Sequence, residues 1–169
     1  SDTKVTLLFS ATMPSNVQQI SKTYMDNPHE ITVGTRNAGI ETVDHVCYAV
    51  RSHDRYLALK RIVDYHPEIY GIIFCRTRVE TKDVAAKLIQ DGYNADALHG
   101  ELSQSQRETV MHKFRIKNLQ ILVATDVAAR GLDVDGVTIV VNYDLPSDPE
   151  VYVHRIGRTG RMGREGQAW

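Results

Sequence analysis

Short apolar runs rich in β-branched residues alternate along the chain with longer segments whose apolar residues recur at helical spacing. This alternation is typical of βαβ units, in which helices join parallel strands. The predicted strands after residue 42 are 43–50, 71–75, 95–99, 120–124 and 137–142. The predicted helices are 54–65, 79–91, 103–116 and 149–159. The fold class is therefore α/β, an open and mostly parallel sheet with helices on both faces.

The first 42 residues follow a separate pattern. Residues 5–9 and 31–33 are apolar and predict short strands, and residues 14–25 predict a helix that ends before Asn27-Pro28. Residues 34–42 are polar, hold two glycines and show no periodicity, which indicates a linker. We therefore expect three parts: a segment at 1–33, a linker at 34–42 and a domain at 43–169, whose last residues, GQAW, begin a further strand.

Composition narrows the class of protein. No apolar run approaches the ~20 residues that a membrane helix needs, so no membrane partner is expected. Cys47 and Cys75 lie next to apolar residues, and the sequence shows no repeated Cys/His spacing of the kind that holds a metal. A disulfide framework or a metal site is not expected, and a reducing compartment, the cytoplasm, fits this cysteine usage.

The net charge of −1 argues against a polybasic nucleic-acid binder, but the charge is unevenly spread. Residues 152–169 hold four arginines and one glutamate, so they carry +3 and the first 151 residues carry −4. Within this stretch, HRIGRTGR at 154–161 places His154, Arg158 and Arg161 on one face of the predicted helix. Two glycines in a helix cost roughly 2 kcal/mol. Glycines and arginines together indicate a polyanion site, because glycine permits close approach and guanidinium forks match phosphate oxygens.

A second candidate, ATDVAARGLDV at 124–134, follows the predicted strand 120–124 at the carboxyl edge of the sheet. Thr125 and Asp126 could simply cap the following turn. A cap does not account for Arg130, Gly131 and Asp133.

Weaker candidates follow other strands. Gln104 and Arg107 share the first turn of a predicted helix, where free N–H groups favour phosphate, although an exposed polar turn explains them equally well. Thr77-Arg78 repeats this arrangement after the strand at 71–75. FSATMP at 9–14 taken alone indicates an ordinary strand-to-helix turn.

Taken together and in order, five motifs resemble those of the DEAD-box ATP-dependent RNA helicases. They are SAT at 10–12, GIIFCRTR at 71–78, LHGELSQSQR at 98–107, ATDVAARGLDV at 124–134 and YVHRIGRTGR at 152–161. The resemblance is to the second RecA-like domain, preceded by the last part of the first. It implies that the domain closes with a first RecA-like domain of the same protein around ATP and single-stranded RNA.

The resemblance also implies roles for individual residues. Arg158 and Arg161 match arginine fingers that reach the γ-phosphate, and Asp133 matches a ribose contact. Arg130 and Gly131 lie between the nucleotide and RNA sites. RNA-backbone contacts, which carry no sequence preference, fall on Thr77, Arg78, Gly100, Gln104, Arg107, Thr125 and Asp126. The residues that match those coupling ATP hydrolysis to duplex separation in the family are Ser10, Thr12, His154 and Arg155.

Some family features are absent from the sequence. It has no GxxxxGK[ST] phosphate loop and no Asp-Glu-Ala-Asp run, so Mg²⁺ is expected to be held mainly by a first domain. We therefore expect a fragment that begins in the last strand of the first domain, ends inside the second and is inactive alone. Arg76 and Glu101 stand where Asn and Asp are common in the family, which weakens the assignment of the neighbouring RNA contacts. A non-catalytic RNA-binding module and a domain of a DNA-directed helicase remain alternatives.

Overall fold

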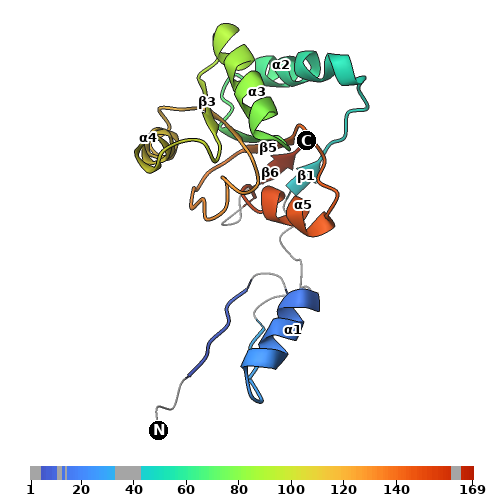
Figure 1. The fold of residues 1–169 in the computed structure, drawn as a ribbon. Helices are drawn as coiled ribbons and strands as arrows, with labels where there is room; N and C mark the ends of the chain where they lie inside the picture. Colours follow the sequence, from blue (N-terminus) through green and yellow to red (C-terminus); the bar gives the residue numbers. More distant parts are fainter. Residues whose placement is uncertain (1–4, 11–12, 14, 33–42, 161–164) are drawn as a thin grey trace. The chain divides into compact units, whose positions relative to one another are not determined.

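The computed structural model describes residues 5–10, 13, 15–32, 43–160 and 165–169. Thr12, Arg161 and the predicted linker at 34–42 lie outside the described residues. The chain divides into two compact units, residues 1–38 and residues 39–169, which are considered separately below (Figure 1). No described helix is both long and apolar enough to cross a membrane.

The first unit contains one described helix, α1 (Ser15–Tyr24), which confirms the predicted helix. The predicted strand at 5–9 is wrong, and residues 31 and 32 of the other predicted strand are not extended into a sheet either. Strands need a hydrogen-bonded neighbour for their N–H and C=O groups, and the described residues of this unit supply none. The apolar side chains of Val5, Leu7 and Phe9 are accordingly exposed.

The second unit is built on one parallel sheet of six strands in the order β1-β6-β5-β2-β4-β3. The strands are β1 (Val43–His45), β2 (Gly71–Phe74), β3 (Ala95–Leu98), β4 (Ile121–Ala124), β5 (Ile139–Asn142) and β6 (Gly166–Ala168). The central strands β2, β4 and β5 are almost wholly buried, as expected for a parallel sheet covered on both faces. The α/β prediction is confirmed, and every strand pair is parallel.

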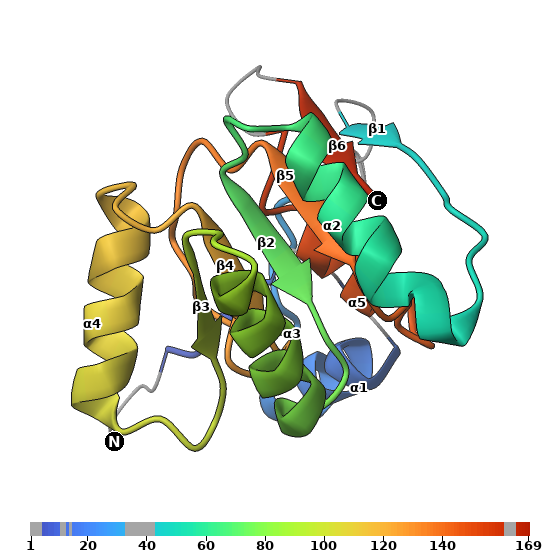
Figure 2. The same ribbon diagram turned by 90° about the horizontal axis from the view of Figure 1, so that it is seen from above.

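Helices cover both faces of this sheet (Figure 2). They are a 3₁₀ turn η2 (Ser52–Asp54), α2 (Arg55–Tyr65), α3 (Arg78–Gln90), α4 (Gln104–Arg115) and α5 (Pro149–Ile156). Successive side chains of β2 enter opposite cores: Phe74 packs with Phe114 of α4, whereas Ile73 packs with Leu59 of α2 and Leu88 of α3. A third, smaller core joins Ile156 of α5 to β1 and β6.

Helix starts follow local capping chemistry. The Thr77 hydroxyl accepts a hydrogen bond from the Glu80 N–H at 3.2 Å and begins α3. Ser103 and Gln106 form a reciprocal capping box at the start of α4. Asp148 caps α5, which opens with Pro149 at a position where a missing N–H costs nothing. Each start therefore lies directly after a loop at the carboxyl edge of the sheet.

Two predicted elements, the strand at 43–50 and the helix at 149–159, are shorter in the structure. The predicted strand at 43–50 is only β1, because β6 pairs with residues 43–45 alone. The final helix ends at Ile156 rather than at 159, so Gly157 is its C-cap and Gly160 lies beyond it with φ at +65°. The predicted cost of two glycines inside a helix therefore does not arise, and the shared helix face of His154 and Arg158 is not formed. The strand expected at the GQAW end is confirmed as β6.

Candidate functional site

The candidate site lies along the carboxyl edge of the parallel sheet in the second unit. Because the strands run in one direction, the loops after β2, β3, β4 and β5 all begin at this edge. These loops and the helix starts that follow them carry most of the site residues predicted for this unit, and the end of α5 with the turn after it carries the others that the structure describes. The predicted site residues that the structure describes in this unit are Thr77, Arg78, Gly100, Gln104, Arg107, Thr125, Asp126, Arg130, Gly131, Asp133, His154, Arg155 and Arg158.

Ion pairs connect the first turns of α3, which follows β2, to the loop after β3. Arg78 Nη1 lies 3.1 Å from Glu101 Oε1, and the Lys82 ammonium contacts the other oxygen of the same carboxylate. The Lys82 hydrogen bond, with the nearby charges of Lys82 and Arg78, lowers the pKa of Glu101. Gly100 is exposed, with open space where a side chain would stand. This part of the edge is therefore open to solvent and basic apart from one neutralised carboxylate.

The start of α4 contacts the segment after β4. Arg107 Nη2 donates to the Ala128 carbonyl oxygen at 2.6 Å, so this side chain ties the helix to that turn. Gln104 is exposed and donates to Glu108 one turn further along the helix, at 2.8 Å. The structure thus brings these two predicted RNA-contact residues to the same edge as Gly100.

In the segment after β4, the residue that caps the turn is Thr125 and not Asp126. Asp126 was one of two candidates to cap the turn, but Thr125 does this: its hydroxyl accepts from the Ala128 N–H at 3.4 Å. The Asp126 carboxylate is instead bound by Arg155 of α5, through Nε to Oδ1 at 2.6 Å and Nη2 to Oδ2 at 2.8 Å. The sequence could not show this pair, because its members are 29 positions apart.

Arg155 is 3% exposed and every part of its guanidinium is engaged. Besides Asp126 it donates from Nη1 to Asn142 Oδ1 at 3.1 Å and to the Asp144 carbonyl oxygen at 2.6 Å. Its guanidinium also lies 5.1 Å from the ring centroid of Phe74. It therefore contacts the ends of β2, β4 and β5 at once, and it can act on a ligand only through these neighbours.

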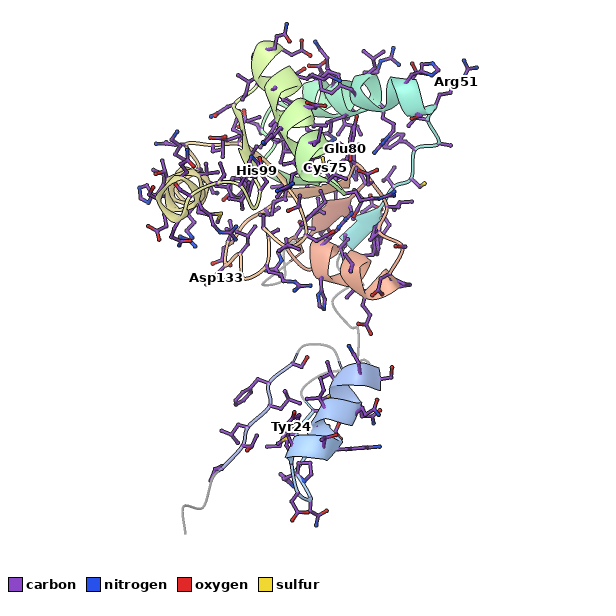
Figure 3. All side chains as sticks on the ribbon, in the orientation of Figure 1. Tyr24, Arg51, Cys75, Glu80, His99 and Asp133 are labelled. Atoms are coloured by element: carbon purple, nitrogen blue, oxygen red, sulfur yellow. The ribbon has the colours of Figure 1, made fainter. Side chains whose placement is uncertain are left out.

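Arg158 lies just beyond α5 and reaches the far end of the same segment. Its Nη1 donates to the Leu132 carbonyl oxygen at 2.6 Å. Leu132 is buried, whereas its neighbours Gly131 and Asp133 are exposed, with Asp133 on the outside of the segment (Figure 3). Gly131 has φ at +71°, a conformation that side chains rarely adopt. The Arg158 guanidinium and the Asp133 carboxylate therefore lie beside an exposed stretch of backbone, where the guanidinium can donate to a phosphate and the carboxylate can accept from a ribose hydroxyl.

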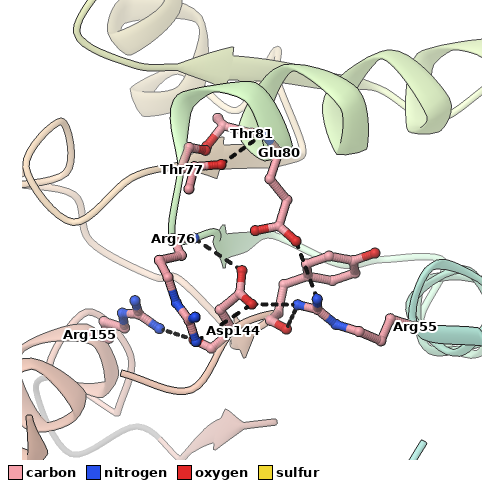
Figure 4. Close-up of polar contacts among 8 residues, drawn as sticks. Arg55, Arg76, Thr77, Glu80, Thr81, Asp144 and Arg155 are labelled. Carbon is pink, nitrogen blue, oxygen red and sulfur yellow. Dashed lines mark hydrogen bonds and ion pairs between the residues drawn. The ribbon is translucent and has the colours of Figure 1, made fainter. Parts of the chain in front are cut away.

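A further polar cluster was not predicted from the sequence. Arg55, Glu80 and Asp144 converge at the ends of β2 and β5 (Figure 4). Burial first, then the adjacent Asp144 carboxylate, raises the pKa of Glu80. Burial opposes ionisation of Asp144 as well, but contacts with Glu80, the Arg76 N–H and Arg55 lower the pKa of Asp144 overall. Only the position of Asp144, two residues after a buried strand, signalled this cluster in the sequence.

The remaining predicted residues lie apart or are outside the described part. His154 is on the exposed side of α5. Ser10 belongs to the first unit and lies in neither a helix nor a strand. Within the part of the chain that the structure describes, no three His, Cys, Asp or Glu side chains gather as metal ligands.

Comparison with known proteins identifies the domain type. The helicase conserved C-terminal domain matches residues 54–163. The ATP-dependent RNA helicase CshA of Limosilactobacillus reuteri is 44% identical over 165 residues, which are 98% of this chain and 33% of the relative. The chain thus spans about a third of the length of the curated relatives it matches.

Solved structures agree with this match. S. cerevisiae Dbp5 bound to RNA and ADP BeF3 is 34% identical, with a TM-score of 0.81, over 95% of this chain and 43% of that one. The C-terminal domain of the DEAD-box protein Dbp5 is 35% identical, with a TM-score of 0.67, over 77% of this chain and 74% of that one. Together with the five motifs, these matches show that the chain belongs to the helicase conserved C-terminal domain family and corresponds to the C-terminal domain of DEAD-box proteins.

Proposed function

We propose that this chain works as the second RecA-like domain in RNA-stimulated ATP hydrolysis and duplex unwinding by a longer protein. The relatives are ATP-dependent RNA helicases about three times as long as the chain, so other parts of such a protein would supply the rest of the machinery. In this proposal residues 1–33 are the end of the first RecA-like domain and residues 34–42 are a linker.

The hydrogen bond between Arg158 and the Leu132 carbonyl carries the proposal. It brings the proposed arginine finger to the segment that holds Arg130, Gly131 and Asp133, the other proposed nucleotide contacts. Arg161 would be the second finger. An arginine finger stabilises charge on the transferring phosphoryl group and contributes a factor of ~10³–10⁵ to turnover. ATP is the nucleotide in this proposal, and Mg²⁺ would be held mainly by the first domain.

The RNA would lie along the loops after β2, β3 and β4. Thr77, Arg78, Gly100, Gln104 and Arg107 would contact the sugar–phosphate backbone, together with Thr125 and the pair of Asp126 and Arg155. Contacts of this kind are independent of sequence. His154 and Arg155 would couple this surface to the nucleotide, and Ser10 and Thr12 would do so from the first domain. A cytoplasmic setting, which the cysteine usage of the sequence predicts, is part of this proposal.

The test is ATP hydrolysis by the full-length protein with Arg158→Lys. We expect most RNA-stimulated turnover to be lost, because a point charge does not replace the guanidinium fork, while RNA binding without nucleotide is retained. Arg61→Lys, on the exposed side of α2, is the matched control and should keep wild-type turnover.

Turnover near the wild-type value in Arg158→Lys would remove this residue from the finger role. Stimulation by DNA as strong as by RNA would favour a DNA-directed helicase instead. Magnesium-dependent hydrolysis by the isolated chain would contradict the proposed division between the two domains.

A further inference from the structure

Asp144 uses its two carboxylate oxygens to join different elements at the carboxyl edge. Oδ1 accepts from Arg55 Nη2 at 2.8 Å, and Oδ2 accepts from the backbone N–H of Arg76 at 3.1 Å (Figure 4). Arg55 opens α2, whereas Arg76 lies in the two-residue connection from Cys75 to the start of α3. The Asp144 side chain is only 12% exposed, so both contacts are shielded from water.

Arg55 is itself fixed from several sides. Its Nη1 lies 3.3 Å from Glu80 Oε1, and Nη2 also donates to the Tyr143 carbonyl oxygen. Its guanidinium stacks over the Tyr143 ring, 4.2 Å from the centroid. The side chains of Arg55 and Glu80 are 25% and 26% exposed. The carboxylate of Asp144 is thus held against a partly buried cation that can scarcely move.

The hydrogen bond to Arg76 fixes the loop that follows β2. Thr77 comes next, and its hydroxyl is already committed to the first turn of α3. With the N–H of Arg76 held by Asp144, the backbone of this short connection is restrained at both ends. Charged hydrogen bonds of this kind are stronger than neutral ones, and they fix geometry as well as adding stability.

The backbone of Asp144 faces the second proposed RNA segment. Its carbonyl oxygen accepts from Arg155 Nη1 at 2.6 Å, and Arg155 holds Asp126. One residue therefore contacts both the Arg76–Thr77 loop and the arginine that anchors the segment after β4. The motifs of the family resemblance include neither Asp144 nor Arg55.

We infer that Asp144 is a positioning residue for RNA-backbone binding, and that Arg55 acts through it. This inference rests on the proposed function, since it concerns the RNA surface of the same site. Asp144 does not touch RNA itself. It holds the loop after β2 in the conformation that binds RNA phosphates. The entropy cost of ordering this loop is therefore not paid when RNA binds.

The test is the RNA dependence of ATP hydrolysis by the full-length protein carrying Asp144→Asn. An asparagine offers one acceptor oxygen where two are needed, and it lacks the charge. We expect the RNA concentration for half-maximal stimulation to rise about tenfold, which corresponds to the loss of one charge-assisted hydrogen bond. Turnover at saturating RNA should stay within about twofold of the wild type, because no nucleotide contact changes.

Asp91→Asn is the matched control. Asp91 is also paired, with the Tyr56 hydroxyl at 2.8 Å and with Lys60 at 3.1 Å, but it lies at the far end of α3 from the loop. It should leave the RNA dependence unchanged. Arg55→Gln is a second variant and should repeat the effect of Asp144→Asn, with no added effect in the double variant.

The outcomes distinguish a failure of the positioning role from a failure of the proposed function. RNA dependence within about twofold of the wild type in both Asp144→Asn and Arg55→Gln would overturn the positioning role. So would an equal rise in Asp91→Asn, because that would be a general effect of lost stability. A wild-type protein without RNA-stimulated hydrolysis would instead refute the proposed function, and the positioning role with it.

Discussion

Arg155 of α5 holds Asp126 at the end of β4 through two parallel hydrogen bonds of 2.6 and 2.8 Å. The arginine side chain is 3% exposed and that of the aspartate 36%. The pair therefore lies at the boundary of the core, where a planar guanidinium fork serves as a structural clamp between a helix and a strand end. The pair joins α5 to the segment after β4.

Replacing Arg155 should destabilise the second unit. In Arg155→Met the acceptors of Asp126, Asn142 and Asp144 lose a buried donor, and we expect a loss of about 2–4 kcal/mol in the free energy of unfolding. Urea unfolding followed by the fluorescence of Trp169, the only tryptophan, measures this.

The matched control for that experiment is Arg78→Met. Arg78 also pairs with a carboxylate, Glu101, but the two side chains are 60% and 43% exposed. An exposed pair contributes about 0–1 kcal/mol, so this variant should unfold near the wild-type midpoint. Equal losses in the two variants would show that the buried pair of Arg155 and Asp126 contributes no more to the free energy of unfolding than the exposed pair.

The carboxyl of Glu80 should make stability fall as pH rises. Burial and the adjacent Asp144 hold the pKa of Glu80 above its ordinary value of 4.5, so the folded state keeps a proton that the unfolded state releases. Stability is therefore lost as pH rises from about 4.5 through the raised pKa. Glu80→Gln does not titrate, so its stability relative to the wild type should improve over that interval in urea unfolding at a series of pH values.

Glu101→Gln gives a control of opposite sign. Contact with Lys82 lowers the pKa of Glu101, so this group contributes stability that is present above its ordinary pKa and lost as pH falls through the lowered value. The variant should therefore lose stability relative to the wild type as pH rises through that acidic interval. Parallel pH curves for the wild type and Glu80→Gln would contradict the assignment of a raised pKa to Glu80.

Gly166 should tolerate no side chain. A Cβ at this first position of β6 would lie 2.5 Å from the backbone nitrogen of Gly160 and 2.8 Å from Cγ2 of Thr159. Thr159 cannot easily yield, because its hydroxyl donates to the Val137 carbonyl at 2.6 Å. We expect Gly166→Ala to destabilise the unit by about 1–3 kcal/mol, as overpacking does.

Gly100→Ala is the matched control for Gly166→Ala. Its Cβ would meet nothing within 4 Å. Thermal unfolding of both variants by circular dichroism should show a lowered midpoint for Gly166→Ala alone. A wild-type midpoint in Gly166→Ala would mean that the crossing between the segment after α5 and β6 is looser than the structure shows.

The sequence by itself determined the α/β fold class, the five described α-helices and the strands β2, β3, β4 and β5. These elements carry strong local signals: continuous apolar runs for buried strands, and apolar residues at helical spacing for helices. It also identified the edge of the sheet on which the candidate residues gather, because parallel strands place all their carboxyl ends together.

Tertiary structure decided what depends on distant partners. Residues 5–9 have the apolar pattern of a strand but no described neighbour to pair with, and β1 is as short as its pairing with β6. The clamp of Arg155 on Asp126 and the cluster of Arg55, Glu80 and Asp144 join residues that are 29 and up to 89 positions apart. Local patterning determines helices and buried strands, whereas strand pairing and side-chain contacts between distant residues depend on how the sheet brings its loops together.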